Sequence, residues 1–138
     1  VGDHVALANH VAIAGYAVIG DHVISGGHTG VTQFTRVGRH AFLGGMALAN
    51  ADVIPYGFVT RNPAHLEGLN LVGLKRRGFA RDVIRDMRTA YRLLFAEEGT
   101  FEERISDVAK LYPGNDPVNE IIAFIQSDQT KKLCMPHD

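Results

Sequence analysis

Residues 1–54 decide the fold: VGDHVA LANHVA IAGYAV IGDHVI SGGHTG VTQFTR VGRHAF LGGMAL ANADVI, divided here every six residues. The first residue of each block is apolar, except for Ser25 in the fifth block. The second is small in most blocks, and the fifth is small or β-branched throughout. A helix repeats every 3.6 residues and a hairpin strand every 2, so neither produces this pattern.

A period of six is typical of a chain wound in short strands around a triangular prism. One apolar residue per side then points inward, and we expect the small residue after it at the backbone turn. Three blocks make one coil, so residues eighteen apart stack on one another. The pattern predicts a left-handed parallel β-helix.

The fourth residue of many blocks is histidine, which is unusual for a solenoid position. His4, His22 and His40 should form one column, and His10 and His28 another. Imidazole is a common zinc ligand, so these columns admit a metal site. The alternative is that the histidines simply stack along the sheet or fill a contact between subunits. We favour stacking and expect no metal, because no cysteine or carboxylate other than Asp3 and Asp21 lies beside the columns in a ligand-like position.

The pattern changes after Pro63, which divides the chain into two predicted domains. Residues 1–62 form the β-helix domain, which begins mid-repeat and is therefore expected to be incomplete at its N-terminus. Residues 63–138 form a C-terminal helical domain. Three short helices that cover the open end of the prism would protect coil edges that otherwise aggregate.

Apolar residues at helical spacing predict these helices. The first runs over 81–95 and is ended by Gly99, and the second runs over 101–112 behind a Thr100–Glu103 capping box. Asp116 and Pro117 start the third, which we expect to continue to about residue 128.

A basic stripe follows one face of the first helix at spacings of 4, 3 and 4. It consists of Arg81, Arg85, Arg88 and Arg92. Nearby acidic residues make an ordinary solvated face one interpretation of the stripe. A docking strip for an acidic partner is the other, and the use of arginine without lysine keeps it open.

Composition excludes several classes of protein. The 138 residues are 46% hydrophobic and 21% charged with a net charge of −1, so there is no general bias toward nucleic acid. The single cysteine, Cys134, excludes an internal disulfide, and no apolar run approaches the ~20 residues needed to span a membrane. We expect a cytoplasmic protein without membrane insertion, and no motif indicates a cofactor.

Three segments carry a resemblance to a known family: VIGDHVISGGHTGVTQFTRVGRHAFLGG (18–45), DVIPYG (52–57) and NLVGLKRRGF (70–79). Together they resemble the UDP-N-acetylglucosamine O-acyltransferases, which begin lipid A synthesis in Gram-negative bacteria. The resemblance implies a homotrimer with active sites between neighbouring prisms. It also implies transfer of a 3-hydroxyacyl chain from acyl carrier protein to the glucosamine 3-hydroxyl of UDP-N-acetylglucosamine.

The resemblance implies a histidine general base in a segment just upstream of Val1. We therefore expect this sequence to be the C-terminal portion of a longer enzyme, inactive by itself. The N–H of Gly15 is implied as the oxyanion donor. Tyr16 stands where the family usually has histidine, and a tyrosine is a poor base at neutral pH. A second family histidine is Thr32 here, whereas Gln33 matches as a substrate-binding residue.

On the nucleotide side, Asn70, Arg76 and Arg77 match residues that contact the uridine and the phosphates. Adjacent arginines have the fork geometry that suits a diphosphate. Val72 replaces an acidic residue found in relatives. Gly45 falls where relatives gauge the acyl chain by side-chain size, so we expect an open groove and a longer 3-hydroxyacyl chain.

The acidic partner of the basic stripe is then the carrier protein, and we expect Lys75 to face it or solvent. Gly15 and Gly45 could instead be corner glycines that the coil requires, Gln33 a ladder residue and Asn70 a helix cap. Three other functions stay open: the N-acyltransferase of the same pathway, a zinc hydratase of the γ-carbonic anhydrase type, and a non-catalytic scaffold.

Overall fold

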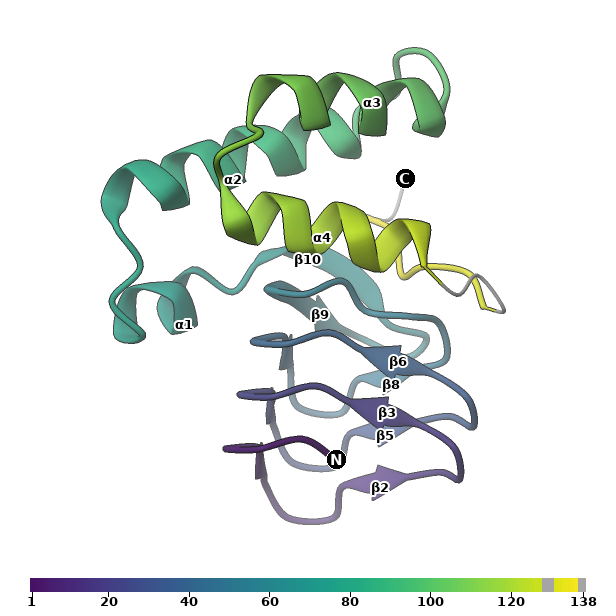
Figure 1. Cartoon of the computed structure of the whole chain (residues 1–138). Coiled ribbons are helices and arrows are strands. Elements are labelled where there is room, and N and C mark those ends of the chain that lie inside the picture. The colour runs from purple at the N-terminus through teal and green to yellow at the C-terminus, as the bar shows by residue number, and fades with distance from the viewer. Residues whose placement is uncertain (128–130, 137–138) are drawn as a thin grey trace.

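The computed structural model describes residues 1–127 and 131–136. Short strands wind into a prism that is covered at its C-terminal end by helices (Figure 1). The strands are β1 (Ala6–Leu7), β2 (Ala12–Ile13), β3 (Val18–Ile19), β4 (Ile24–Ser25), β5 (Gly30–Val31), β6 (Arg36–Val37), β7 (Phe42–Leu43), β8 (Leu48–Ala49), β9 (Gly57–Thr60) and β10 (His65–Leu69). The helices are α1 (Leu71–Arg76), α2 (Arg81–Leu94), α3 (Phe101–Leu111) and α4 (Asp116–Gln126).

The strands form three parallel sheets, one for each side of the prism. β1, β4 and β7 line the first side, β2, β5 and β8 the second, and β3 and β6 the third. Partners lie eighteen residues apart, as for Ala6 with Ile24 and Val18 with Arg36. The predicted left-handed parallel β-helix is confirmed.

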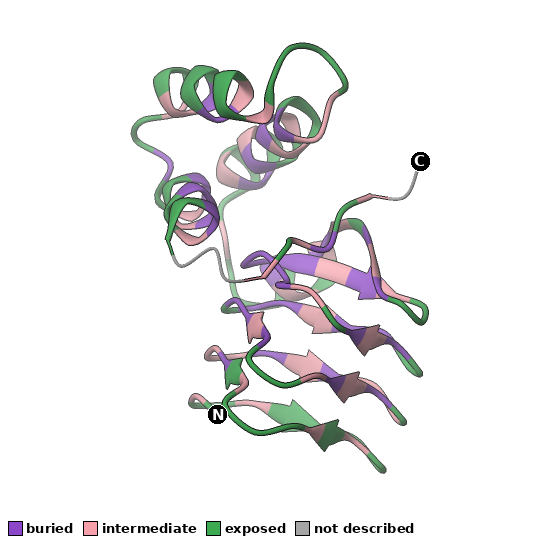
Figure 2. Ribbon diagram, turned by 90° about the vertical axis from the view of Figure 1, so that its right-hand side faces the viewer, coloured by how far each residue is buried: buried purple, intermediate pink, exposed green. Residues whose placement is uncertain are grey.

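Two residues per block face the core, so the prediction of one was wrong. The first residues Val37 and Leu43 are buried, and so are the fifth residues Val23, Thr35 and Val53. The fifth position is small or β-branched because two side chains of each block share the narrow interior. Figure 2 shows burial increasing from the first coil, where Leu7 is 43% exposed, toward the helices.

The turn does not lie at the small second residue as expected. It lies at the third and fourth residues, and the fourth takes a left-handed conformation, with φ of 61° at both His22 and His40. Second-position glycines are needed for close approach of the next coil instead. A Cβ on Gly20 would lie 2.8 Å from the backbone nitrogen of Arg39.

The fourth-position side chains stack along the corners of the prism, as predicted. Ring centroids are 5.0 Å apart for His4 and His22 and 4.7 Å for His22 and His40. Tyr56 extends this column on His40 at 5.2 Å. We call these four residues the histidine ladder. His10 and His28 form the second column, at 4.8 Å.

The junction after the repeats contains two features that the sequence did not predict. β9 and β10 form an antiparallel hairpin that adds to the first sheet, and α1 follows it directly. The hairpin contains a cis peptide bond between Asn62 and Pro63. The division into domains at residues 62 and 63 stays a prediction.

The three later helices begin close to where the sequence places them. Thr100 accepts a hydrogen bond from the Glu103 backbone, and Asn115 caps α4 in the same way. α2 ends at Leu94 rather than at Gly99, which lies in the connection to α3. The expected end of the third helix at Asp128 lies outside the described residues. None of the helices in the described part of the chain is long and apolar enough to cross a membrane.

Candidate functional site

The turn at residues 15–16 and the turn at 33–34 stack at the corner between the second and third sheets. We call this the Gly15 corner. The Phe34 N–H donates a hydrogen bond to the Gly15 carbonyl at 3.3 Å, which orients the Gly15 peptide. Within the described residues, the Gly15 N–H has no hydrogen-bond partner. It is therefore available to a ligand oxygen.

The same position at another corner shows why this N–H is free. The Asp3 N–H donates to the Asp21 carboxylate of the next coil at 2.8 Å. The residue eighteen after Gly15 is Gln33, whose side chain makes no such bond to any described residue. A Cβ on Gly15 would meet nothing within 4 Å, and its φ is not positive, so the coil does not require glycine there.

Tyr16 lies on the outer surface of the Gly15 corner. Its side chain stacks on Phe34 with centroids 5.1 Å apart and planes inclined by 7°, and Tyr16 is 78% exposed. The stacked pair forms an exposed apolar rib beside the Gly15 N–H. The structure therefore places Gly15, Tyr16 and Gln33 at one corner, and their catalytic and substrate-binding roles stay predictions.

The nucleotide-side residues lie at a different corner, between the third and first sheets. Asn70 is buried there, and its Nδ2 donates to the His40 carbonyl at 3.0 Å while its Oδ1 accepts from the Gly73 N–H at 3.1 Å. Asn70 thus caps α1, which is the alternative role that the sequence allowed for it. The Arg76 and Arg77 side chains form no hydrogen bond or ion pair with the residues described.

The histidine ladder meets the end of α1 at this corner. Phe79 packs edge-on against His40 and Tyr56, with both centroid distances 5.7 Å. Burial, together with the nearby His22, Arg39 and Arg77, lowers the pKa of His40 to about 4. Burial and the Arg77 charge also lower the pKa of His22. Because the lowered pKa values favour neutral His22 and His40 rings, the positive charge at this corner comes from the arginines.

Gly45 lies at the third corner, between the first and second sheets. A Cβ there would come no closer than 3.7 Å to the Gly27 carbonyl, so space is open around it. One chain therefore places Gly15, Gly45 and the α1 arginines at three different corners. It does not bring them into a single site.

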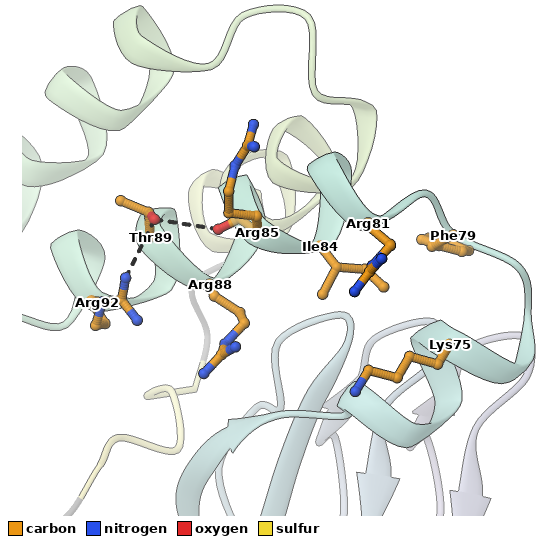
Figure 3. Close-up of a pocket in the computed structure, with 8 residues that line it drawn as sticks. All are labelled: Lys75, Phe79, Arg81, Ile84, Arg85, Arg88, Thr89 and Arg92. Carbon is orange, nitrogen blue, oxygen red and sulfur yellow. Dashed lines mark hydrogen bonds between the residues drawn. The ribbon is translucent and has the colours of Figure 1, made fainter.

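The basic stripe and Lys75 line one pocket between α1 and α2 (Figure 3). We call it the basic pocket, and its lining residues are Lys75, Phe79, Arg81, Ile84, Arg85, Arg88, Thr89 and Arg92. Lys75, Arg81 and Arg88 point into the space and have no ionic partner in the described part of the chain. Arg85 points away and pairs with Asp86 at 3.3 Å, and Arg92 bonds Thr89.

Several contributors to these surfaces lacked a sequence signal. Phe79, Ile84 and Thr89 also line the basic pocket, and nothing in the sequence assigned them to it. Lys131, from the C-terminal segment, donates to the Thr32 and Thr35 hydroxyls beneath the Gly15 corner. That segment has no periodicity from which its position could be inferred.

The described residues contain no group of three or more His, Cys, Asp or Glu side chains that could hold a metal ion. The geometry of the ladder explains why its histidines do not form one. The rings of His22 and His40 lie nearly parallel, inclined by 14°, so their nitrogens are displaced along the column and do not converge.

A family model described as UDP-N-acetylglucosamine O-acyltransferase, domain 2, matches residues 52–134, which is well over half of the chain. The chain belongs to this family. Acyl-[acyl-carrier-protein]–UDP-N-acetylglucosamine O-acyltransferase of Caulobacter vibrioides is 59% identical over 136 residues, covering 99% of this chain and 52% of that protein. The Rhizobium etli protein of the same name is 45% identical, covering 99% of this chain and 50% of its own length.

Solved structures of the acyltransferase family share the fold. UDP-N-acetylglucosamine O-acyltransferase from Moraxella catarrhalis superposes with a TM-score of 0.90 at 37% identity, covering 97% of this chain and 52% of that chain. The Arabidopsis UDP-N-acetylglucosamine acyltransferase gives 0.89 at 32% identity, covering 96% and 49%. The chain spans about half the length of the relatives that it matches.

Proposed function

We propose that the protein containing this chain transfers a 3-hydroxyacyl group from acyl carrier protein to the 3-hydroxyl of UDP-N-acetylglucosamine, the first step of lipid A biosynthesis. The observation that carries the proposal is the 59% identity over 136 residues to the Caulobacter vibrioides protein named acyl-[acyl-carrier-protein]–UDP-N-acetylglucosamine O-acyltransferase. A cytoplasmic location stays a prediction from the sequence.

In this reaction the sugar hydroxyl attacks the thioester carbonyl, a C–O bond forms and the C–S bond breaks. The hydroxyl proton passes to a general base and then to the departing thiolate. A histidine upstream of Val1 is the base that the family resemblance implies. The Gly15 N–H is free in the described structure and suits the oxyanion of the tetrahedral intermediate. Tyr16 and Gln33 flank it.

The separation of the three corners supports an active site built between chains. Gly15, Gly45 and the α1 arginines lie at different corners of one prism. In the proposed homotrimer, corners of neighbouring prisms would face each other and combine these groups. Arg76 and Arg77 would then bind the diphosphate, with Asn70 beside the uridine, and Gly45 would leave the groove open for a longer acyl chain.

The basic pocket supports docking of an acidic carrier protein. Lys75, Arg81 and Arg88 are directed into one space without carboxylate partners among the described residues. Uncompensated cations attract acidic partners, and this attraction weakens as salt is added. Carrier affinity should therefore fall with ionic strength, more steeply than nucleotide affinity.

Calorimetric titration of the full-length gene product with UDP-N-acetylglucosamine and with acyl carrier protein tests both assignments. Arg76→Ala with Arg77→Ala should abolish nucleotide binding and leave carrier binding, whereas Arg88→Glu should do the reverse. No nucleotide binding by the wild-type protein, or equal binding by the double variant, would overturn the proposal. A product acylated on nitrogen would indicate the N-acyltransferase instead, and stoichiometric zinc would indicate a hydratase.

A further inference from the structure

A lysine from the C-terminal segment reaches the turn that builds the Gly15 corner. The Lys131 Nζ lies 3.0 Å from the Thr32 Oγ1 and 3.0 Å from the Thr35 Oγ1. The two hydroxyl oxygens lie 3.0 Å from each other, and the Thr32 Oγ1 lies 3.4 Å from the Ala49 carbonyl. These threonines are the two ends of the turn that carries Gln33 and Phe34.

The chemistry of the lysine fixes the direction of these hydrogen bonds. An ammonium group only donates, so both hydroxyls accept from Lys131. The Thr32 hydroxyl can then donate to the Ala49 carbonyl, and the Thr35 hydroxyl to Thr32. Both hydroxyl rotors are thereby set. Thr35 is fully buried, so its hydroxyl has no contact with solvent while Lys131 is in place.

The backbone around Lys131 is anchored to the prism. The Asp52 N–H donates to the Lys132 carbonyl at 2.8 Å, and the Cys134 N–H donates back to the Asp52 carbonyl at 2.7 Å. The Leu66 N–H donates to the Met135 carbonyl at 3.0 Å. The segment therefore holds the lysine at a defined place, although Thr32 is 99 residues earlier in the chain.

The Thr32–Thr35 turn is also bonded to the backbone of Gly15, whose N–H is the proposed oxyanion donor. The Thr35 N–H closes the turn on the Thr32 carbonyl at 3.2 Å, and the Phe34 N–H bonds the Gly15 carbonyl at 3.3 Å. The Gly15 carbonyl belongs to the peptide that follows Gly15, so this bond constrains the backbone on the C-terminal side of the free N–H.

We propose that Lys131 is a positioning residue that locks the Thr32–Thr35 turn and so holds Gln33 and the Gly15 backbone in their productive orientation. The proposal rests on the acyltransferase function proposed above. Lys131 acts through the two threonines and does not contact the reacting atoms.

The test uses the full-length gene product with three variants. Lys131→Met removes the ammonium and keeps an unbranched chain, Lys131→Arg keeps a cation, and Lys132→Met changes the exposed neighbour as a matched control. Because small displacements of catalytic groups cost up to about a hundredfold in rate, Lys131→Met should lower kcat at least about tenfold. Its KM for the nucleotide and its Tm should stay close to wild type. Lys131→Arg should recover most of the rate, and Lys132→Met should match wild type.

A double-variant cycle and amide exchange separate positioning from loss of stability. Thr32→Val should lower kcat, and adding it to Lys131→Met should cost little more, because both break one network. Hydrogen exchange at the Phe34 and Thr35 amides should speed up in Lys131→Met but not in Lys132→Met. An unchanged kcat in Lys131→Met, or a Tm loss that accounts for its lower kcat, would overturn the proposal.

The same measurements distinguish failure of this proposal from failure of the proposed function. If the wild-type protein transfers no acyl group, the function is wrong, and amide exchange alone decides the role of Lys131. Faster exchange confined to the Lys131→Met variant supports the lock on the turn. Equal exchange rates in Lys131→Met and Lys132→Met refute it.

Discussion

The Asn70 side chain joins the helical half of the molecule to the repeats, because its Nδ2 donates to the His40 carbonyl at 3.0 Å across thirty residues of sequence. The same side chain caps α1 by accepting from the Gly73 N–H. One buried amide therefore fixes both the start of α1 and its place on the prism. The positions of Arg76 and Arg77 depend on it.

Asn70→Ala should lower the free energy of unfolding by about 1–3 kcal/mol, since it removes a helix cap and leaves buried polar groups without partners. Urea denaturation at neutral pH measures the change. Asn50 is exposed, so Asn50→Ala is the matched control, with an expected effect within about 0.5 kcal/mol. Equal losses in the two variants would contradict the assigned role.

Two glycines of similar appearance in the sequence should respond in opposite ways to alanine. A Cβ on Gly20 would lie 2.8 Å from the Arg39 nitrogen, so Gly20→Ala should cost about 1–3 kcal/mol. Gly15→Ala meets no neighbour within 4 Å and should leave stability unchanged or raise it slightly. Thermal denaturation compares the two, and a destabilised Gly15→Ala would identify Gly15 as a structural corner residue.

The repeat half was predictable because its packing is periodic. Each inward side chain stacks on the equivalent residue of the next coil, so the six-residue pattern reports the tertiary contacts directly. The pairing of His22 with His40 followed from their separation alone. The role of the second-position glycine could not be predicted, because a glycine at a turn and a glycine at a close backbone approach look the same in the sequence.

Beyond the repeats, the sequence predicted the three later helices, but it did not predict the β9–β10 hairpin, α1 or the C-terminal segment, because their contacts are distant and aperiodic. α1 depends on the Asn70 bond to His40. The C-terminal segment depends on two backbone hydrogen bonds, from the Asp52 N–H to the Lys132 carbonyl and from the Cys134 N–H to the Asp52 carbonyl. The same applies to the candidate site. The roles of Gly15 and Gln33 are predictions from the family resemblance, whereas Lys131 belongs to a segment without a pattern.

Acid should destabilise the histidine ladder. The folded pKa of His40 is about 4 against an ordinary value of 6.5, so the unfolded chain binds more protons between these values. Stability should therefore be retained above pH 6.5 and lost as pH falls toward 4. The loss is on the order of 2–3 kcal/mol, and urea denaturation from pH 4 to 7.5 measures it.

His40→Phe should flatten this pH dependence. Phenylalanine preserves the stacked ring, and Phe34 already occupies the equivalent left-handed position with φ of 65°. His10→Phe in the other, exposed column is the control and should change the slope less. If both variants keep the wild-type slope, His40 is not the source of the acid sensitivity.

The Asp52 carboxylate holds Arg36, whose side chain reaches from the prism to α4. Asp52 is 1% exposed, its Oδ1 accepts from the Arg36 N–H at 2.8 Å, and its Oδ2 lies 2.9 Å from an Arg36 guanidinium nitrogen. The guanidinium also stacks 4.3 Å from the centre of the Phe124 ring. Removal of a buried partner leaves the other charge uncompensated, so Asp52→Ala should cost about 3–5 kcal/mol.

Two further variants separate charge from hydrogen bonding. Asp52→Asn keeps an acceptor for the Arg36 N–H and should lose less than Asp52→Ala. Asp86→Ala breaks the exposed pair with Arg85 and should cost no more than about 0.5 kcal/mol. Because burial limits screening, the Asp52→Ala loss should persist in high salt, as measured by urea denaturation. Similar small losses for Asp52→Ala and Asp86→Ala would show that α4 is held by apolar packing rather than by this ion pair.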